Sequence, residues 1–278
     1  MIDTIKEPKP VDQLTFTDDG MFQTVMRNPK ICAELVERLL NVEINHIDYP
    51  ELEKEIAPYY TTKSIRLDVY LKDSDKVIDI EMQSYNQEAI GKHTRYYQSM
   101  IDIDNLMKGD DYSDLKESYI LFICKNDPFK KDSKLHFKLP CYTFKNTCIE
   151  NSDVNLNDKS LKVIYNASAY QSEKNEKIRA FLHYIYTNEP GEDDFSKRLS
   201  AIVEQTKMNE KFRREYATMN LHDRDLIRAA KKEATEQKAF ETATNMLKKK
   251  YPTSDISEIT GLPLEQVLEL QKTIFVQA

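Results

Sequence analysis

Two acidic residues, Asp68 and Glu81, have the spacing and surroundings to bind a shared cation. Each lies in a run of alternating apolar and polar residues, at 65–71 and 76–83. Such alternation predicts β-strands, in which every second side chain points to the same face. The Lys72-Asp73-Ser74-Asp75 stretch between the runs favours a turn, so the runs are expected to form a hairpin with both acids on its polar face.

The register of this hairpin decides how close the two acids come. A two-residue loop at 74–75 places Asp68 directly opposite Glu81, and Arg66 opposite Gln83. Opposed side chains have Cβ atoms about 4.5–5.5 Å apart, where two like charges are destabilising. A divalent cation would remove that repulsion, and Mg²⁺ takes one or two carboxylates while leaving room for water and a phosphate. The alternative is that both acids simply line a solvated face of the sheet.

The residues around the two acids resemble a known nuclease signature. Asp68 followed by Glu81-Met82-Gln83 is similar to the D…(D/E)xK motif of PD-(D/E)XK nucleases. More narrowly, it resembles the transposase-like branch, the Rpn recombination-promoting nuclease/putative transposase family, in which the last motif position is often Gln. The similarity extends, in order, to residues 18–40, to 95–129 and to GLPLEQVLEL at 261–270, and it covers most of the chain.

The resemblance implies a fold and a division of the chain. The implied fold is α/β, with a restriction-endonuclease-like three-layer α/β/α core around a central mixed sheet and a helical C-terminal extension. The nuclease-like domain is expected over 1–190, and a helical region ending in a helix-turn-helix-like pair over 191–278. The residue pattern agrees, because the continuous apolar run 118–124 follows a predicted helix and so predicts a crossover to a buried central strand.

The resemblance also implies an activity. It points to a Mg²⁺-dependent DNA endonuclease, with Mn²⁺ as an alternative metal, associated with DNA recombination or mobile elements. Asp68, Glu81 and the backbone carbonyl of Met82 would hold the metal, and the catalytic residues would be Asp68, Glu81 and Gln83. Gln83 stands where the superfamily more often has Lys. An amide can orient water through hydrogen bonds but cannot act as a base, so the identity of the general base stays open.

Cations near the hairpin are the candidate contacts to DNA phosphates. Arg66 either clamps a phosphate or forms an ion pair with Glu81. Lys92 and Arg95 lie in a predicted helix at 88–108 and either meet the phosphate backbone or form an ordinary solvated face. The loop 125–138 is rich in Lys and follows a predicted central strand, where open α/β sheets usually bind ligands; it either contacts phosphate or is solvated surface. The candidate DNA-binding residues in this loop are Lys130, Lys131 and Lys134.

Composition and simple motifs argue against several other classes. The net charge of −7 disfavours a protein that coats nucleic acid non-specifically. Four cysteines without CxxC spacing and five histidines without HxxxH or HExxH spacing disfavour zinc. The sequence has no glycine-rich phosphate loop, so no nucleotide cofactor is expected. The first residues lack a secretory-signal pattern and no apolar run reaches about 18 residues, so we expect a cytoplasmic protein that does not span a membrane.

Two other function classes stay open beside the nuclease. One is a catalytically silent module that keeps the nuclease fold and binds DNA or protein. The other is an interaction protein that forms a homodimer through its C-terminal helices, because 195–250 predicts one or two long helices. Nearer the N-terminus, residues 41–49 (NVEINHIDY) are expected to form a short strand.

Overall fold

The computed structural model describes residues 9–44, 50–57, 63–84, 89–129 and 135–276, with the backbone alone for 219–233 and 274–276. The chain divides into two compact units. The first, called here the sheet unit, is Val11–Phe212; the second, the helical unit, comprises Arg213–Ala278 with Met1–Pro10. The helix Asp194–Met208 belongs to the sheet unit.

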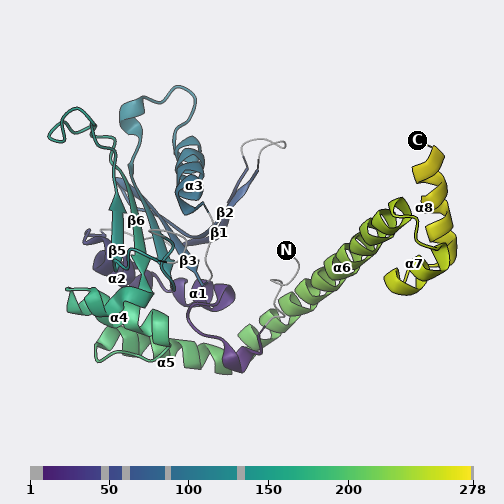
Figure 1. Cartoon of the computed structure of the whole chain (residues 1–278). Helices are drawn as coiled ribbons and strands as arrows, with labels where there is room; N and C mark the ends of the chain where they lie inside the picture. The colour runs from purple at the N-terminus through teal and green to yellow at the C-terminus, as the bar shows by residue number, and fades with distance from the viewer. Residues whose placement is uncertain (1–8, 45–49, 58–62, 85–88, 130–134, 277–278) are drawn as a thin grey trace. The chain divides into compact units, whose positions relative to one another are not determined.

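A six-stranded mixed sheet forms the centre of the sheet unit (Figure 1). The spatial order is β1-β2-β3-β4-β6-β5. β1 with β2, β2 with β3 and β5 with β6 pair antiparallel, whereas β3, β4 and β6 run parallel. The strands are β1 (Glu51–Ile56), β2 (Ile65–Lys72), β3 (Lys76–Gln83), β4 (Glu117–Cys124), β5 (Cys141–Phe144) and β6 (Ser160–Asn166).

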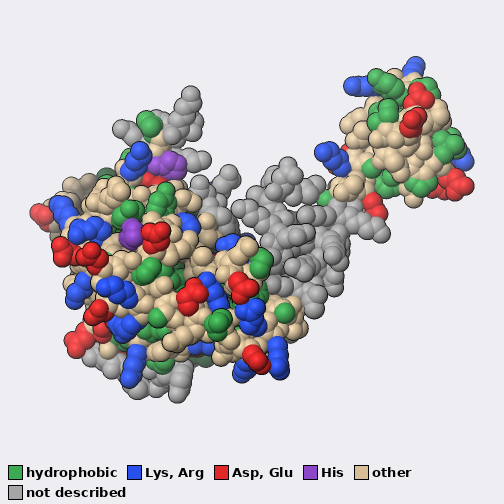
Figure 2. All heavy atoms as spheres, turned by 90° about the horizontal axis from the view of Figure 1, so that it is seen from below, with side chains coloured by type: hydrophobic (Ala, Val, Ile, Leu, Met, Phe, Trp, Pro, Cys, Tyr) green, Lys and Arg blue, Asp and Glu red, His purple; other side chains and the backbone are tan. Residues whose placement is uncertain are grey.

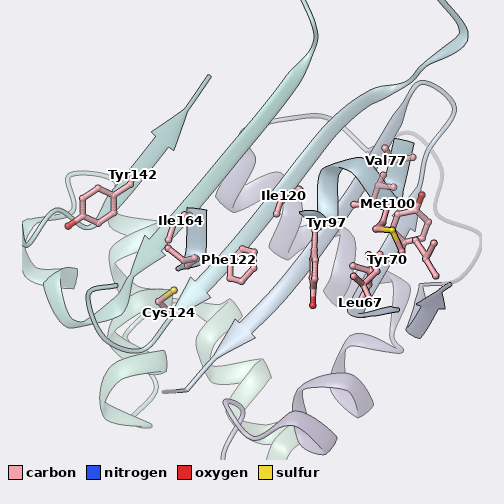
Figure 3. Packing of buried hydrophobic residues seen from close by; sticks show 14 residues of the cluster. Leu67, Tyr70, Val77, Tyr97, Met100, Ile120, Phe122, Cys124, Tyr142 and Ile164 are labelled. Carbon is pink, nitrogen blue, oxygen red and sulfur yellow. The ribbon is translucent and has the colours of Figure 1, made fainter. Parts of the chain in front are cut away.

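Helices cover both faces of this sheet, which confirms the expected three-layer α/β fold. On one face α3 joins Tyr70, Ile120 and Phe122 in a single apolar cluster (Figure 3). On the other face the Tyr165 hydroxyl donates to the Leu39 carbonyl of α2 at 2.6 Å, and α4 and α5 extend this layer. The helices are α1 (Asp19–Met26), α2 (Pro29–Leu40), α3 (Ile90–Asn105), α4 (Glu176–Thr187) and α5 (Asp194–Met208), with 3₁₀ turns at Val11–Gln13, Tyr112–Asp114 and Ala167–Ser172.

The first strand lies later in the chain than its sequence pattern indicated. Residues 41–44 form neither helix nor strand, 45–49 lie outside the described residues, and β1 begins only after Pro50. The strand expected over 41–49 is therefore wrong at 41–44. β1 reads ELEKEI and lies at an edge of the sheet, where charged side chains remain in water and also discourage pairing with other chains. An edge strand of this kind carries little apolar alternation to recognise.

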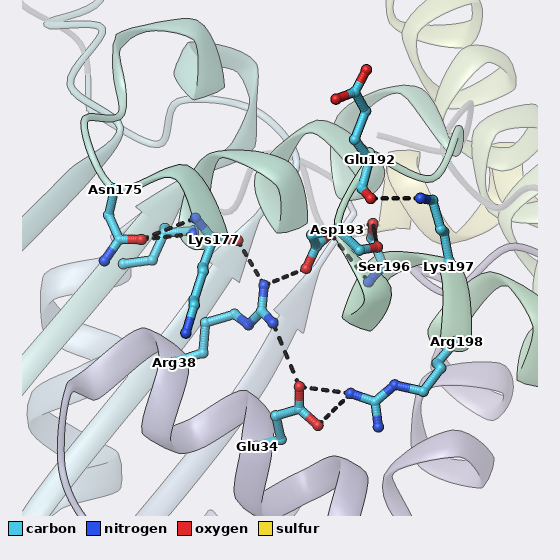
Figure 4. Close-up of polar contacts among 10 residues, drawn as sticks. Glu34, Arg38, Asn175, Lys177, Glu192, Asp193, Ser196, Lys197 and Arg198 are labelled. Atoms are coloured by element: carbon cyan, nitrogen blue, oxygen red, sulfur yellow. Dashed lines mark hydrogen bonds and ion pairs between the residues drawn. The ribbon is translucent and has the colours of Figure 1, made fainter.

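A buried arginine ties three helices of the sheet unit together (Figure 4). Arg38 of α2 donates to the carbonyl of Lys177 in α4 at 2.9 Å and to the carboxylate of Asp193 at 2.6 Å. Asp193 is the N-cap of α5 and also accepts from the backbone N–H of Ser196. The guanidinium lies 4.4 Å from the centre of the Phe195 ring. This side chain therefore fixes α2, α4 and α5 into one layer.

The helical unit has an apolar core of its own. The end of α6 (Glu210–Lys248) packs against α7 (Thr253–Thr260) and α8 (Leu264–Val276) through Leu247, Ile256 and Val267. Gly261 follows α7 in the left-handed conformation (φ 72°), which ends that helix and allows the short turn to α8. The expected pair of short C-terminal helices is therefore present. Among the helices described, none is both long and apolar enough to cross a membrane.

Candidate active site

The β2–β3 hairpin has the alignment expected from its alternation. The loop is closed by the Asp73 N–H, which donates to the Lys76 carbonyl at 2.9 Å. The registered pairs run from Lys72↔Val77 to Val69↔Ile80. Asp68 and Glu81 are the next pair along this alignment, so the expected register is confirmed up to the two acids.

The regular ladder is interrupted at Asp68 on the side of β1. The registered pairs pass from Leu52↔Val69 to Lys54↔Leu67 and omit Glu53 opposite Asp68. Glu53 has a φ of 51°, a left-handed conformation that is uncommon for a residue with a side chain. Strained backbone of this kind concentrates at functional sites, and here it lies beside the acid that the motif singles out.

Crossed hydrogen bonds bring the two acids together at the point where the β2–β3 pairing ends. The backbone N–H of Asp68 donates to Glu81 Oε1 at 3.0 Å. The backbone N–H of Met82 donates to Asp68 Oδ2 at 3.1 Å. Each carboxylate thus accepts a hydrogen bond from the opposite strand, which fixes both acids on one small area of the sheet.

Burial strongly disfavours negative charge on this area. Asp68 is 8% exposed and Glu81 3%, and Asp79, two residues before Glu81, is fully buried. Burial, and after it the negative charge of Asp19 at the start of α1, raise the pKa of Asp68 to about 6. The pKa values of Asp79 and Glu81 are raised well above the ordinary carboxyl range by burial, and by the neighbouring carboxylates as well. The acids therefore carry an electrostatic cost that a bound cation would offset.

Unsatisfied acceptors line the same face of β3. The amide oxygen of Gln83 and the carboxylate oxygens of Asp79 are buried and accept no hydrogen bond from an N–H group. The Asp79 carboxyl can hydrogen-bond only to the Glu81 carboxyl, and only while one of the two acids is protonated. Positions 79, 81 and 83 share one side of the strand because side chains alternate. Buried acceptors without donors are rare in folded proteins and call for an explanation, and bound cations or ordered water would supply the missing partners.

Oxygen ligands of this kind suit a hard divalent cation. Mg²⁺ is commonly held by one or two carboxylates with the remaining positions filled by water and phosphate. Asp68 and Glu81 meet that requirement. The backbone carbonyl of Gln83 accepts from the backbone N–H of Lys125, the residue after β4, at 2.9 Å. Because backbone carbonyls alternate along a strand, the carbonyl of Met82 is directed the other way, toward β2 and the acids. In the parts of the chain that the structure describes, no three His, Cys, Asp or Glu side chains converge to hold a metal by themselves.

Two cations lie in this region: Arg66 in the field of Asp68, and Lys63 in the field of His93. Arg66 is 59% exposed on its side chain and forms an ion pair with Glu53 at 3.5 Å, so of the two roles expected for it, an ion pair is present but with a different acid. Lys63 is held near α3, because the Tyr96 hydroxyl donates to the Lys63 carbonyl at 2.6 Å. The Tyr97 hydroxyl likewise donates to the Arg66 carbonyl, at 3.3 Å.

Lys92 and Arg95, also expected to contact phosphate, are not brought to the acids. Lys92 and Arg95 lie on the solvent-exposed side of α3, opposite the side that packs on the sheet. Lys130, Lys131 and Lys134 lie outside the described residues. On the face of the sheet unit seen in Figure 2, Lys and Arg side chains alternate with Asp and Glu instead of gathering into a basic surface.

Three residues in this region were not found by sequence reasoning. Asp19 lies in the field of Asp68, Arg66 and Glu53. Lys63 precedes the first alternating run, and Tyr97 lies in the helix predicted at 88–108. The available signal was that Asp18-Asp19 offers two acids where a cap needs one. Indeed Asp18 accepts from the N–H of Thr15, before the helix, and does not cap α1 with its side chain.

Asp79 makes the electrostatic cost of this site measurable. A carboxyl whose pKa is raised in the folded protein favours folding at low pH, and that contribution is lost as pH rises through the raised value. We expect Asp79→Asn to raise the free energy of unfolding of the metal-free protein at pH 8 by about 1 kcal/mol or more, because a buried, unpaired polar or charged group costs that much. At about pH 4.5–5, close to the ordinary pKa of a carboxyl group, the gain in the free energy of unfolding should be smaller.

Urea unfolding in the presence of a chelator at the two pH values measures this gain. Asp153→Asn, on an exposed loop, is the matched control and should change stability at neither pH. A variant at position 79 that is less stable than the wild-type protein at pH 8 would show that the Asp79 carboxylate has a stabilising partner.

A match to a known protein family agrees with the geometry of the site. A family model described as PD-(D/E)XK nuclease family transposase matches residues 20–243. The match begins in α1, contains the Asp68–Glu81 hairpin and ends within α6. No curated protein and no solved structure matches the chain.

Proposed function

The chain belongs to the PD-(D/E)XK nuclease family transposases, and on that premise we propose that it is a divalent-metal-dependent DNA endonuclease acting in recombination or transposition. The family relates the chain to nucleases of mobile elements. The proposal goes further, to phosphodiester hydrolysis by this chain. The observation that supports it best is the pair of buried carboxylates, Asp68 and Glu81, held together where the hairpin pairing ends.

In this proposal Asp68, Glu81 and the Met82 carbonyl hold Mg²⁺ or Mn²⁺. A divalent cation at such a site lowers the pKa of bound water and offsets the charge of a phosphate. The protein side chains supply position and orientation. Gln83, with its buried amide oxygen unpartnered, accepts a hydrogen bond from the attacking water and so orients it.

Substrate binding in this proposal depends on the exposed cations. Arg66, in the field of Asp68, and Lys63, beside α3, contact the phosphates around the scissile bond, while Lys92 and Arg95 on the outer side of α3 contact the flanking backbone. Lys130, Lys131 and Lys134 extend this contact from the loop after β4. Because the whole chain is acidic, DNA should bind only at these cations, and its affinity should weaken steeply with salt.

Plasmid nicking tests the proposed activity directly. Supercoiled DNA incubated with the full chain is expected to become nicked in Mg²⁺ or Mn²⁺ and to stay intact in a chelator. Asp68→Asn should remove the activity, because the amide keeps the side-chain shape but loses the charge that attracts the cation. Nicking that survives both the chelator and this substitution would exclude the proposed site.

A catalytically silent module is the second candidate, and Gln83 is the observation in its favour, since no base stands at that motif position. It predicts DNA or protein binding without nicking in either metal.

A homodimer through the helical unit is a further proposal, supported by exposed apolar residues on α7 and α8: Ile259, Leu264 and Leu268. Light scattering of the full chain against a chain with Leu264 and Leu268 changed to Ser tests it, since a dimer built on this face should become a monomer.

A further inference from the structure

Hydrolysis at the proposed site needs a proton acceptor that the motif does not supply. The water that attacks a phosphate must lose a proton, and a side chain that takes it must be unprotonated and within reach. Gln83 has no basic atom. The buried acids Asp68 and Glu81 are assigned to the metal. The acceptor therefore has to come from another element that faces this area, and this inference rests on the proposed function.

His93 of α3 faces the same side of the sheet as the acids. Its ring packs edge-on against Tyr97, with ring centres 4.1 Å apart, and against Phe122 of β4 at 5.6 Å. In the parallel β3–β4 pairing Phe122 is registered with Glu81, so the two side chains lie beside each other on one face. His93 thus lies over the strand residue next to the catalytic glutamate. Figure 3 shows Phe122 and Tyr97 on this face.

The direction of α3 places His93 toward the open end of the site. α3 follows β3 directly and runs back toward the start of β4, so its first turn lies near the end of the sheet at which β3 and β4 finish. Tyr97 is one turn further on and reaches Arg66 through its hydroxyl. His93 is one turn closer to the level of Gln83 and is half-buried, so one part of the imidazole can meet solvent.

We propose that His93 is the general base of the reaction and takes the proton of the attacking water, the role for which Gln83 has no suitable atom. The water oxygen forms the new bond to phosphorus, and its proton passes to the unprotonated imidazole nitrogen. The bond from phosphorus to the leaving deoxyribose oxygen breaks, and that oxygen takes a proton from solvent. Gln83 orients the water, and Arg66 contacts the phosphate.

The surroundings of His93 favour the unprotonated imidazole that this role needs. Burial lowers the pKa of His93, and the positive charge of Lys63 lowers it further. The groups around it are Lys63 from the segment before β2 and Tyr97 on its own helix, and Phe122 beneath it is registered with Glu81 of β3. A base with a pKa below the ordinary value for histidine is available over the whole neutral range.

Cleavage kinetics of a His93 variant test this role. We expect His93→Gln to slow plasmid nicking by about 10²-fold, the usual contribution of a general base. The wild-type rate should fall on the acid side as the imidazole takes a proton, and this fall should be lost in the variant. Added imidazole should restore part of the activity of His93→Ala. His183→Gln is the matched control, because His183 packs on Tyr170 at 5.0 Å, away from the hairpin.

Two measurements without cleavage complete the test. Metal-free protein with labelled histidine side chains, titrated with a short DNA duplex, should show a shift of the His93 imidazole signals in the NMR spectrum and none for His183. Thermal unfolding and DNA affinity of His93→Gln should match the wild-type protein, which separates a catalytic role from a structural one.

The outcomes separate this inference from the function on which it rests. If the wild-type protein fails to nick DNA with any divalent metal, the proposed function falls and the role of His93 falls with it. If the wild-type protein nicks DNA and His93→Gln does so at the same rate and with the same pH profile, only the role of His93 is overturned. A slow variant that imidazole does not rescue, with the acid-side fall still present, would also overturn it.

Discussion

Glu81→Gln is expected to reduce metal-dependent DNA cleavage by about 10³-fold. Glu81 is 3% exposed and accepts the Asp68 N–H at 3.0 Å, so its carboxylate is held in one position. The glutamine side chain has the same size and can stay in that position. It lacks the negative charge that would attract the cation, and its NH₂ group cannot coordinate a metal.

Initial rates of plasmid nicking in Mg²⁺ and in Mn²⁺ measure this effect, and calorimetric titration with Mn²⁺ measures the loss of metal binding. Glu117→Gln is the matched control, because Glu117 begins β4 at the far end of the β3–β4 pairing and is registered with Lys76. The variant at position 81 should unfold no more easily than the wild-type protein, since the change removes one of several crowded buried charges. Undiminished cleavage by Glu81→Gln would remove the carboxylate pair from the mechanism.

Arg38→Ala is expected to destabilise the sheet unit by about 3 kcal/mol, which is the usual cost of removing one partner from a buried charged network. The Arg38 side chain is 9% exposed, and its guanidinium makes hydrogen bonds to α4 and to Asp193 as well as a contact with the Phe195 ring. Alanine leaves the Lys177 carbonyl and the Asp193 carboxylate without this donor and leaves a void above Phe195.

Arg198→Ala tests the same cluster from its exposed side. Arg198 is 52% exposed and pairs with Glu34 at 2.6 Å, and Glu34 also contacts Arg38 (Figure 4). An exposed pair of this kind contributes about 0–1 kcal/mol, so the two arginines should differ clearly in urea unfolding. Equal losses would show that Arg38 behaves as a surface residue. Neither change touches the hairpin, so nicking per folded molecule should stay the same.

The sequence by itself determined the β2–β3 hairpin. Strand alternation has a period of exactly two residues, so a one-residue slip would move the apolar side chains of 65–71 onto the polar face. That constraint excludes odd shifts of register, and a two-residue loop at 74–75 then puts Asp68 opposite Glu81. The continuous apolar run at 118–124 similarly determined a buried strand parallel to 76–83, because parallel strands are covered on both faces.

Only the tertiary structure decided what surrounds the two acids. Asp19, Lys63 and His93 come from three segments far apart in the chain. No local sequence pattern predicts which residues of other segments they will lie against. The pairing of Arg66 with Glu53 depends on β1, whose charged edge sequence gives almost no periodic signal. Local periodicity reports which face of an element is buried, whereas the partner on the other side of that face is set by packing between distant segments.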